Sequence, residues 1–259
     1  MLKIHYQTFG SGKPIVLIHG WAMHSAIWRD FAQVLAQHYQ VTCVDLPGHG
    51  HSEKIASFTL EQVSDALVNA VPNVSCSWLG WSLGATVALD IAKRYPDRVD
   101  ALVLMAGNPH FTGREDWCGM RSPLLDQFAE NLANDCQATL LRFLAIQVMG
   151  LPDAKTMAKT LKTALLERPA PDAETLHGGL NILKHTDLRP ALANLSRPLS
   201  VILGNKDSLV PVAVSEQIQA LQPSAQINVI DKAAHTPFIS HQETVVDIIT
   251  RFMDEHVPG

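Results

Sequence analysis

Short apolar runs, rich in β-branched residues, alternate with stretches of helical periodicity along the first 108 residues. Each run ends in a turn, and the runs are PIVLIHG (14–20), VTCVDLPG (41–48), SCSWLGWS (75–82) and ALVLMAG (101–107). Amphipathic or apolar segments follow the first three runs. This alternation predicts parallel βαβ units.

The segment TLEQVSDALVNA (59–70) is the clearest helix in this part of the chain. Thr59 and Gln62 have the spacing of a capping box, and the apolar positions between residues 60 and 68 recur at helical intervals. We therefore expect a helix that begins near Thr59.

The pattern changes after Asn108. From about residue 109 to residue 185 the periodicity is helical and no convincing strand is present, as in SPLLDQFAENLA (122–133), CQATLLRFLAIQVMG (136–150) and DAKTMAKTLKTALLE (153–167). Strand-like runs resume at LSVILG (199–204) and INVIDKAAH (227–235), and helical segments follow each of them.

This order predicts one α/β domain, with a mostly parallel sheet, helices on both faces and an inserted helical cap. We expect residues 1–108 and 187–259 to form the core and residues 109–186 to form the cap. No repeat or Gly/Ser linker separates the parts, which favours one domain with a cap over two separate domains. The junctions are expected in short loops at Pro109 and near Arg189.

Composition narrows the class of protein. Of 259 residues, 47% are hydrophobic and 17% charged, and no apolar run approaches the ~20 residues of a membrane-spanning helix. A net charge of −5 argues against bulk attraction to nucleic acid or membrane. The four cysteines include no C-x-x-C pair, and the N-terminus has no signal-peptide core, so we expect a cytoplasmic protein. We also expect it to be a monomer.

GWSLG (80–84) stands where a strand-like run gives way to a helical pattern. A serine at a sharp strand-to-helix turn needs small neighbours, because strand and helix approach closely there. Its hydroxyl then projects above the carboxyl edge of the sheet, and the N–H groups that open the helix face a developing oxyanion. This spacing indicates a nucleophile elbow with Ser82 as the nucleophile.

A serine nucleophile needs a histidine base, and that histidine needs a carboxylate to orient it. Asp207 follows one predicted strand and His235 follows the next, so both should lie at the same sheet edge as Ser82. Asp231 is a rival carboxylate, but it is only four residues before His235. We therefore predict a triad of Ser82, Asp207 and His235.

The main-chain N–H groups of Trp21 and Leu83 are the expected oxyanion donors, since Trp21 follows the first strand-like run in the sequence His19-Gly20-Trp21. The indole of Trp21 is equally well explained by packing. His49 and His51 lie two residues apart near Asp45, but in a Pro/Gly-rich turn without a third ligand. We expect neither a metal nor an organic cofactor.

The segments LIHGWA, DLPGHGHS, GWSLG, GNKDSLVP and AAHTPF together resemble the α/β-hydrolase superfamily. A narrower similarity, carried by LGWSLG, RFLAIQVMG, LHGGLNILKHTDLR and KAAHTPFISH, is to the family of pimeloyl-[acyl-carrier protein] methyl ester esterases of biotin synthesis. The resemblance implies a serine carboxylesterase that removes the methyl group from a carrier-linked pimeloyl chain.

The resemblance also implies which residues contact the substrate. Those residues are Trp21, Ser82, Leu83, His235 and an acyl channel formed by Phe143, Leu144, Ala145, Ile146 and Gln147. Phe143 and Gln147 are one helical turn apart on one face, which suits an apolar channel with a polar group. Ordinary packing of the cap is the alternative for Phe143.

An acyl carrier protein, the partner that the resemblance implies, is acidic and would need a local basic face. Lys155, Lys159 and Lys162 recur at helical spacing opposite an apolar stripe, and Arg142 precedes the channel residues. We expect these four residues to form the docking face. The alternative is an ordinary solvated helix face.

Other functions on this fold are the alternatives. A broad short-chain carboxylesterase, or a hydrolase of carbon–carbon bonds, would use the same fold and triad. A ligand-binding protein without catalysis would keep only the fold. Reaction of Ser82 with a fluorophosphonate probe distinguishes the catalytic alternatives from the binding one.

Overall fold

The computed structural model describes residues 2–71 and 74–257. Its described residues form a seven-stranded sheet in the order β1-β3-β2-β4-β5-β6-β7. The strands are β1 (Tyr6–Phe9), β2 (Pro14–Ile18), β3 (Gln40–Val44), β4 (Cys76–Trp81), β5 (Val99–Met105), β6 (Leu199–Gly204) and β7 (Gln226–Ile230). All neighbouring pairs are parallel except β1 with β3. The carboxyl ends of six strands therefore meet at one edge.

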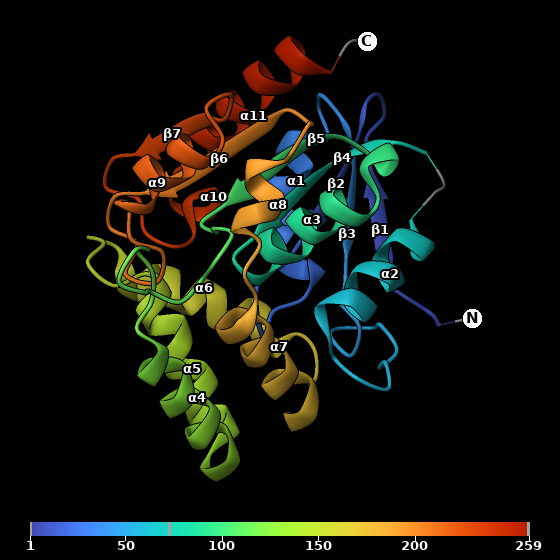
Figure 1. The fold of residues 1–259 in the computed structure, drawn as a ribbon. Coiled ribbons are helices and arrows are strands. Elements are labelled where there is room, and N and C mark those ends of the chain that lie inside the picture. The colour runs from blue at the N-terminus through green and yellow to red at the C-terminus, as the bar shows by residue number, and fades with distance from the viewer. Residues whose placement is uncertain (1, 72–73, 258–259) are drawn as a thin grey trace.

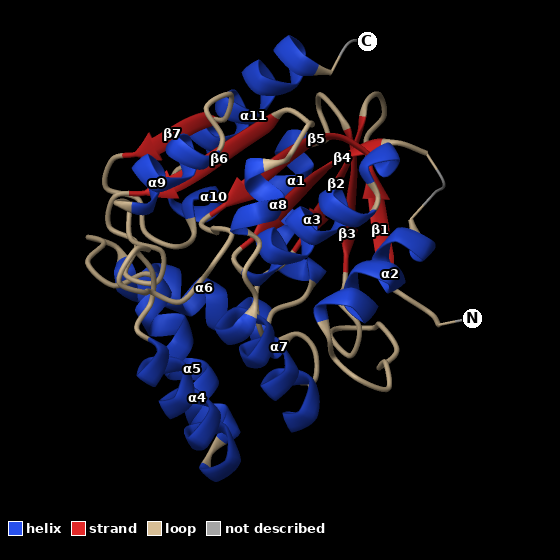
Figure 2. Cartoon of the chain, viewed as in Figure 1, coloured by secondary structure: helices blue, strands red, loops and turns tan. Residues whose placement is uncertain are grey.

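Helices cover both faces of this sheet (Figure 2). On one face α3 packs against β4 and β5 and also contacts α2 and α8, while on the other face α1 and α11 contact each other. The core helices are η1 (Ser25–Trp28), α1 (Arg29–Leu35), α2 (Leu60–Ala70), α3 (Leu83–Arg94), η2 (Pro96–Arg98), α8 (Arg189–Ala193), α9 (Val214–Leu221), α10 (Pro237–Ser240) and α11 (Gln242–His256). Large apolar side chains such as Trp28, Trp78 and Phe252 are almost fully buried in this layered core.

The chain between β5 and β6 forms a group of helices beside the carboxyl edge of the sheet (Figure 1). These are α4 (Ser122–Asn134), α5 (Cys136–Gln147), α6 (Ala154–Leu166) and α7 (Ala173–His185). Helix α4 packs against α5 and α7, and α5 packs against α6. A bidentate ion pair between Arg29 of α1 and Glu167, the residue after α6, joins this group to the layers around the sheet.

The α/β architecture predicted from the sequence is confirmed, and the six parallel strands coincide with the six strand-like runs. Thr59 caps α2 as expected, since its hydroxyl accepts a hydrogen bond from the Gln62 N–H at 3.3 Å. The antiparallel edge strand β1 was not predicted. Its side chains are mostly exposed, so it carries no apolar alternation that would indicate a strand.

The prediction of helix directly after Asn108 is wrong for residues 109–121. This segment is an irregular loop with isolated bridges between Thr112 and Met120 and between Arg114 and Trp117. Gly113 and Gly119 lie so close that a Cβ on Gly119 would stand 2.7 Å from the Gly113 nitrogen. Two stretches of backbone thus pack directly against each other here, in a conformation that is not helical.

Candidate active site

Ser82 lies at the sharp turn between β4 and α3. Its φ of 57° and ψ of −117° are unusual for a residue with a side chain. A Cβ on Gly80 would stand 2.1 Å from the Gly84 carbonyl oxygen, and a Cβ on Gly84 would stand 2.3 Å from the Ile18 oxygen. Both glycines are therefore required for strand and helix to meet at this angle.

The structure brings Ser82, His235 and Asp207 together in one hydrogen-bonded chain. His235 Nε2 lies 2.9 Å from Ser82 Oγ, and His235 Nδ1 lies 2.7 Å from Asp207 Oδ2. Because a carboxylate only accepts, Nδ1–H donates to Asp207 and Nε2 is left to accept from the serine hydroxyl. This is the arrangement in which a histidine can take the serine proton.

Asp207 and His235 are each held by further contacts. The second oxygen of Asp207 accepts from the main-chain N–H groups of Leu209 and Val210 at 2.8 and 3.0 Å. The His235 N–H donates to the Gln147 carbonyl at 3.1 Å, and the indole of Trp81 donates to the His235 carbonyl at 2.7 Å. His235 is thus fixed from the sheet and from α5, and its side chain is 1% exposed.

Asp231, the rival carboxylate, lies apart from this chain. It is exposed, and its Oδ1 accepts a hydrogen bond from Asn205 Nδ2 at 2.6 Å. The geometry therefore favours Asp207 as the carboxylate partner of His235.

The loop after β2 carries the predicted oxyanion donor. Among the described residues, neither the Trp21 N–H nor the Leu83 N–H donates to a protein acceptor. A Cβ on Gly20 would lie 3.3 Å from the Ser82 Cβ, so this loop lies directly against the serine. Both N–H groups are therefore free to bind an oxyanion beside Ser82.

His19 orients this loop, a role that the sequence analysis missed. Its Nε2 accepts from the Leu46 N–H at 3.0 Å, so Nδ1 carries the proton and donates to the Gly20 carbonyl at 2.8 Å. In a trans peptide the N–H points away from the preceding carbonyl. His19 therefore helps to fix the direction of the Trp21 N–H.

Burial keeps the histidines near this loop neutral. Burial, reinforced by the nearby His49, lowers the pKa of His19 to about 3. Burial likewise lowers the pKa of His49 to about 4, and its ring centroid is 5.3 Å from that of His19. Asp45, which raises both pKa values, itself accepts hydrogen bonds from the main-chain N–H groups of Ser25 and His51.

Among the described residues, no three or more His, Cys, Asp or Glu side chains are grouped as metal ligands.

The ring of Trp21 joins the sheet to the helices between β5 and β6. Its Nε1 donates to the Leu176 carbonyl of α7 at 2.9 Å, and its ring packs edge-on against Phe143 of α5 at 4.8 Å. A Cβ on Gly179 would stand 2.6 Å from the Trp21 ring. Gly179, the second glycine of the pair in LHGGLNILKH, allows this approach, whereas a Cβ on the first, Gly178, would stand 2.5 Å from the Phe58 Cβ.

The predicted channel residues divide between two sides of α5. Phe143, Leu144 and Gln147 are buried, whereas Ala145 is exposed and Ile146 is half-buried. Gln147 is 1% exposed, and neither polar atom of its carboxamide has a partner among the described residues. The buried face of α5 therefore offers apolar side chains and one free polar group beside His235.

The predicted docking residues lie on the outer surface of α5 and α6. Arg142, Lys155, Lys159 and Lys162 are all exposed, and none forms an ion pair with a described residue. A cavity of about 300 Å³ between the two helices is lined by Leu141, Leu144, Ala158, Lys159 and Lys162. An apolar floor that includes a channel residue is thus flanked by two of the four cations.

No helix in the described part of the chain is long and apolar enough to cross a membrane.

Comparison with known proteins gives sequence relatives over the whole chain. A family model described as alpha/beta hydrolase fold matches residues 13–242. A pimeloyl-[acyl-carrier protein] methyl ester esterase from Aliivibrio fischeri is 39% identical over 254 residues, 98% of each chain. A protein of the same name from Methylococcus capsulatus is 40% identical, with 97% of this chain and 99% of that protein aligned. Another, from Salmonella newport, is 41% identical, with 93% of this chain and 94% of that protein aligned.

Solved structures give the same fold at lower identity. An esterase from Exiguobacterium antarcticum has a TM-score of 0.87 at 21% identity, covering 98% of this chain and 96% of its own. A bromoperoxidase from Bacillus anthracis has the same TM-score, identity and coverage. At such identities the likeness establishes the fold alone.

Proposed function

The chain belongs to the alpha/beta hydrolase family, and we propose that it is a carboxylesterase of biotin synthesis. Its reaction converts pimeloyl-[acyl-carrier protein] methyl ester and water to pimeloyl-[acyl-carrier protein] and methanol. The full-length relatives that share 39–41% of its residues carry this activity in their names. The observation that carries the chemistry is the hydrogen-bonded chain from Ser82 through His235 to Asp207.

In the first half-reaction Ser82 Oγ attacks the carbonyl carbon of the methyl ester, and its proton passes to His235 Nε2. The carbonyl oxygen becomes an oxyanion that accepts from the free N–H groups of Trp21 and Leu83. The bond between carbon and the methoxy oxygen then breaks, and His235 returns the proton to form methanol. An acyl-enzyme on Ser82 remains.

In the second half-reaction water attacks the acyl-enzyme and gives a proton to His235 Nε2. The bond from the carbonyl carbon to Ser82 Oγ breaks, and Oγ regains its proton from His235. The product is the free carboxylic acid of the pimeloyl chain. Throughout, Asp207 holds Nδ1–H of His235 and supports its transient positive charge.

We assign residues 109–186 to a cap domain and residues 1–108 and 187–259 to the core. The buried side of α5, with Phe143, Leu144 and Gln147, faces the triad region in this assignment, as the bond from the His235 N–H to the Gln147 carbonyl supports. An apolar wall with one carboxamide suits a chain of methylene groups between two polar ends. The exposed position of Ala145 leaves its side chain outside this wall.

The carrier protein docks, in this proposal, on the face formed by Arg142, Lys155, Lys159 and Lys162. Exposed cations without ion-pair partners attract an acidic surface at little cost in desolvation. The cavity between α5 and α6 lies beneath two of these lysines and reaches Leu144, which also belongs to the proposed channel. Leu144, the residue that this cavity shares with the proposed channel, supports an entrance for the carrier's flexible arm at this place.

Growth of a bacterial biotin auxotroph that lacks its own methyl ester esterase tests this function. The wild-type chain should restore growth without added biotin, whereas Ser82→Ala should not, at equal expression. Rescue by Ser82→Ala would refute the assigned nucleophile. Failure of the wild type to rescue, combined with rapid hydrolysis of short free esters, would instead favour a broad carboxylesterase.

A further inference from the structure

Asn108 is a buried polar residue that the catalytic chain does not use. It lies three residues beyond the end of β5 and is 2% exposed, and neither its Nδ2 nor its Oδ1 has a partner among the described residues. Burial of an amide without hydrogen bonds is unfavourable. A buried carboxamide of this kind is therefore a candidate to bind a ligand.

The backbone before Asn108 lies against the nucleophile elbow. Strand β5 neighbours β4, and the Ser82 N–H donates to the Met105 carbonyl at 3.0 Å. A Cβ on Gly107 would lie 3.3 Å from the Ser82 carbonyl oxygen and 2.3 Å from the Ala85 Cβ. The segment that carries Asn108 thus passes directly beside Ser82.

The order of the strands decides on which side of Ser82 this segment lies. Strand β4 has β2 on one flank and β5 on the other, and β6 and β7 continue beyond β5. The oxyanion loop with Trp21 follows β2, whereas Asp207 follows β6 and His235 follows β7. Asn108 is therefore on the same side of Ser82 as His235, opposite the oxyanion loop.

That side is where the leaving group of an ester must lie. With the oxyanion held by Trp21 and Leu83, the methoxy oxygen has to be within reach of His235 Nε2, which protonates it. Water enters the same position in the second half-reaction, because attack of water is the reverse of departure of an alcohol. One protein group can therefore bind the methoxy oxygen first and the attacking water afterwards.

We propose that the carboxamide of Asn108 binds the oxygen atom in this position, as the methoxy group during acylation and as water during deacylation. This assignment rests on the esterase function proposed above. The carboxamide offers both a donor and an acceptor, which matches an ester oxygen that only accepts and a water that does both.

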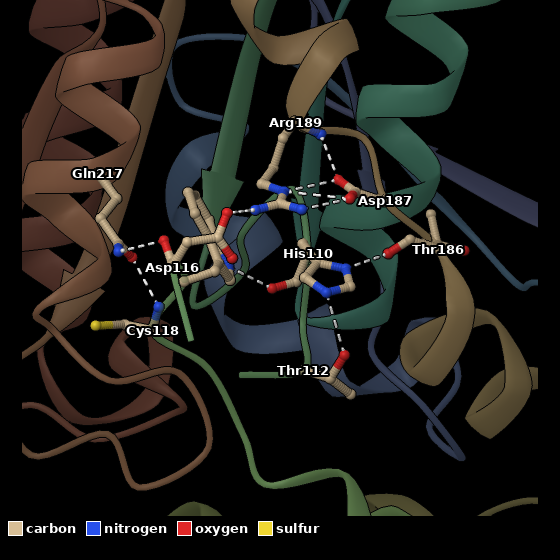
Figure 3. A network of polar contacts seen from close by, with 9 residues as sticks. His110, Thr112, Asp116, Cys118, Thr186, Asp187, Arg189 and Gln217 are labelled. Atoms are coloured by element: carbon tan, nitrogen blue, oxygen red, sulfur yellow. Dashed lines mark hydrogen bonds and ion pairs between the residues drawn. The ribbon is translucent and has the colours of Figure 1, made fainter. Parts of the chain in front are cut away.

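A network of polar contacts fixes the backbone on the far side of Asn108 (Figure 3). The Pro109 carbonyl accepts from the Leu188 N–H at 2.8 Å, and His110 Nδ1 donates to the Thr186 carbonyl at 2.8 Å. The Trp117 indole donates to the His110 carbonyl at 2.7 Å. Asn108 is therefore held between the elbow and this network, as a preorganised binding group requires.

The test uses Asn108→Leu, which keeps the size of the side chain and removes its hydrogen-bonding atoms. We expect kcat/KM for carrier-linked methyl pimeloyl to fall about 10- to 100-fold, the effect of losing one or two hydrogen bonds in the transition state. The midpoint of thermal unfolding should not fall, because the variant removes an unpaired buried amide. Asn108→Ser replaces the carboxamide by a hydroxyl, which can still donate and accept, so this variant should show an intermediate rate. It takes the place of the leucine variant in the test if that variant does not fold.

Ser77→Ala is the matched control. The Ser77 hydroxyl is also buried without a partner, but it lies near the start of β4, where Ser77 pairs with Ile15. This variant should keep the wild-type kcat/KM. An equal loss in Ser77→Ala and Asn108→Leu would assign the effect to packing and overturn the proposal.

Pre-steady-state kinetics with a short p-nitrophenyl ester separate the two half-reactions. Nitrophenolate leaves without protonation, so Asn108→Leu should keep the rapid initial burst of nitrophenolate and slow only the steady state, in which water attacks. Unchanged kinetics, or equal slowing of the burst and the steady state, would overturn the role of Asn108. A wild-type protein that shows this burst but leaves carrier-linked methyl pimeloyl intact would refute the proposed substrate and leave the test of Asn108 valid.

Discussion

At the scale of single residues, close backbone approach explains why Ser82 can hold its strained conformation. A side chain would not fit at Gly80 or at Gly84, because backbone atoms lie too close. The Ser82 N–H donates to the Met105 carbonyl of the adjacent strand. The strain at Ser82 is thus offset by a close-packed turn, which aims the hydroxyl at His235. The same turn leaves the Leu83 N–H free for the oxyanion.

The buried histidines beneath the oxyanion loop make stability sensitive to acid. The pKa of His19 is lowered to about 3 and that of His49 to about 4, against an unfolded value of about 6.5. Between these values the unfolded chain binds more protons than the native protein, so the free energy of unfolding falls as pH falls. Above about pH 6.5 both states hold neutral histidines and this dependence disappears.

We predict that the urea midpoint falls steadily from pH 6.5 to pH 4.5, with each histidine contributing at most about 1.4 kcal/mol per pH unit. His49→Phe, which places an apolar ring beside Phe58, should make the decline shallower. Urea titrations of both proteins at several pH values provide the measurement. An identical slope in the wild type and the variant would show that His49 is not part of the acid response.

The sequence predicted the triad because each member follows a strand and because parallel strands end at one edge. It could not predict that His19 orients the Gly20 carbonyl, because that role depends on a main-chain N–H of Leu46 from another loop. The sequence also could not show that the Asn108 carboxamide has no hydrogen-bond partner among the described residues. Whether a buried amide lacks a partner is known only when every neighbour is in place.

At the scale of elements, the helices α4 to α7 were easier to predict than the segment that leads into them. Their apolar positions recur at helical intervals, and Asp135 and Asp172 cap α5 and α7 through side-chain hydrogen bonds. Residues 109–121 lack such a signal, because their conformation depends on Arg189 and Gln217, which are distant in the sequence and contact the Trp117 ring and the Asp116 carbonyl. The exposed edge strand β1 was missed for a related reason: its strand conformation depends on pairing with β3, which its own sequence does not show.

The basic face on α5 and α6 gives the prediction at this scale. Arg142→Glu combined with Lys155→Glu and Lys159→Glu should lower kcat/KM for carrier-linked methyl pimeloyl about tenfold or more at low ionic strength, because rim charges steer association. Salt should reduce the difference, since the screening length is about 10 Å at 0.1 M. Hydrolysis of a small free ester should stay unchanged.

A matched control replaces Lys3, Lys93 and Arg251 by glutamate. These three residues are exposed outside α4 to α7, and their replacement changes the net charge by the same amount. This control should retain most of its kcat/KM on both substrates. Equal losses in the two triple variants would attribute the effect to net charge, and a loss on the free ester would indicate damage to α5 and α6. Either result would contradict a docking face at these residues.

At the scale of the whole molecule, the sheet positions the three residues of the proposed triad, and the helices between β5 and β6 contact them. The sheet edge places Ser82, Asp207 and His235, and α5 and α7 contact this edge through Gln147, Phe143 and Leu176. A protein of net charge −5 presents four cations on the outside of α5 and α6, and none of the four forms an ion pair with a described residue. In the proposed function, one group of helices would thus both bind the carrier and complete the site that acts on the ester.

Hydrolysis of carrier-linked methyl pimeloyl by the purified protein tests this account most directly. Release of methanol, measured for the wild type and for Ser82→Ala, should be rapid in the first and slower by about 10⁴-fold or more in the second, with the unfolding midpoint unchanged. Methanol release by Ser82→Ala at a rate near the wild type, or an intact methyl ester after incubation with the wild type, would contradict it.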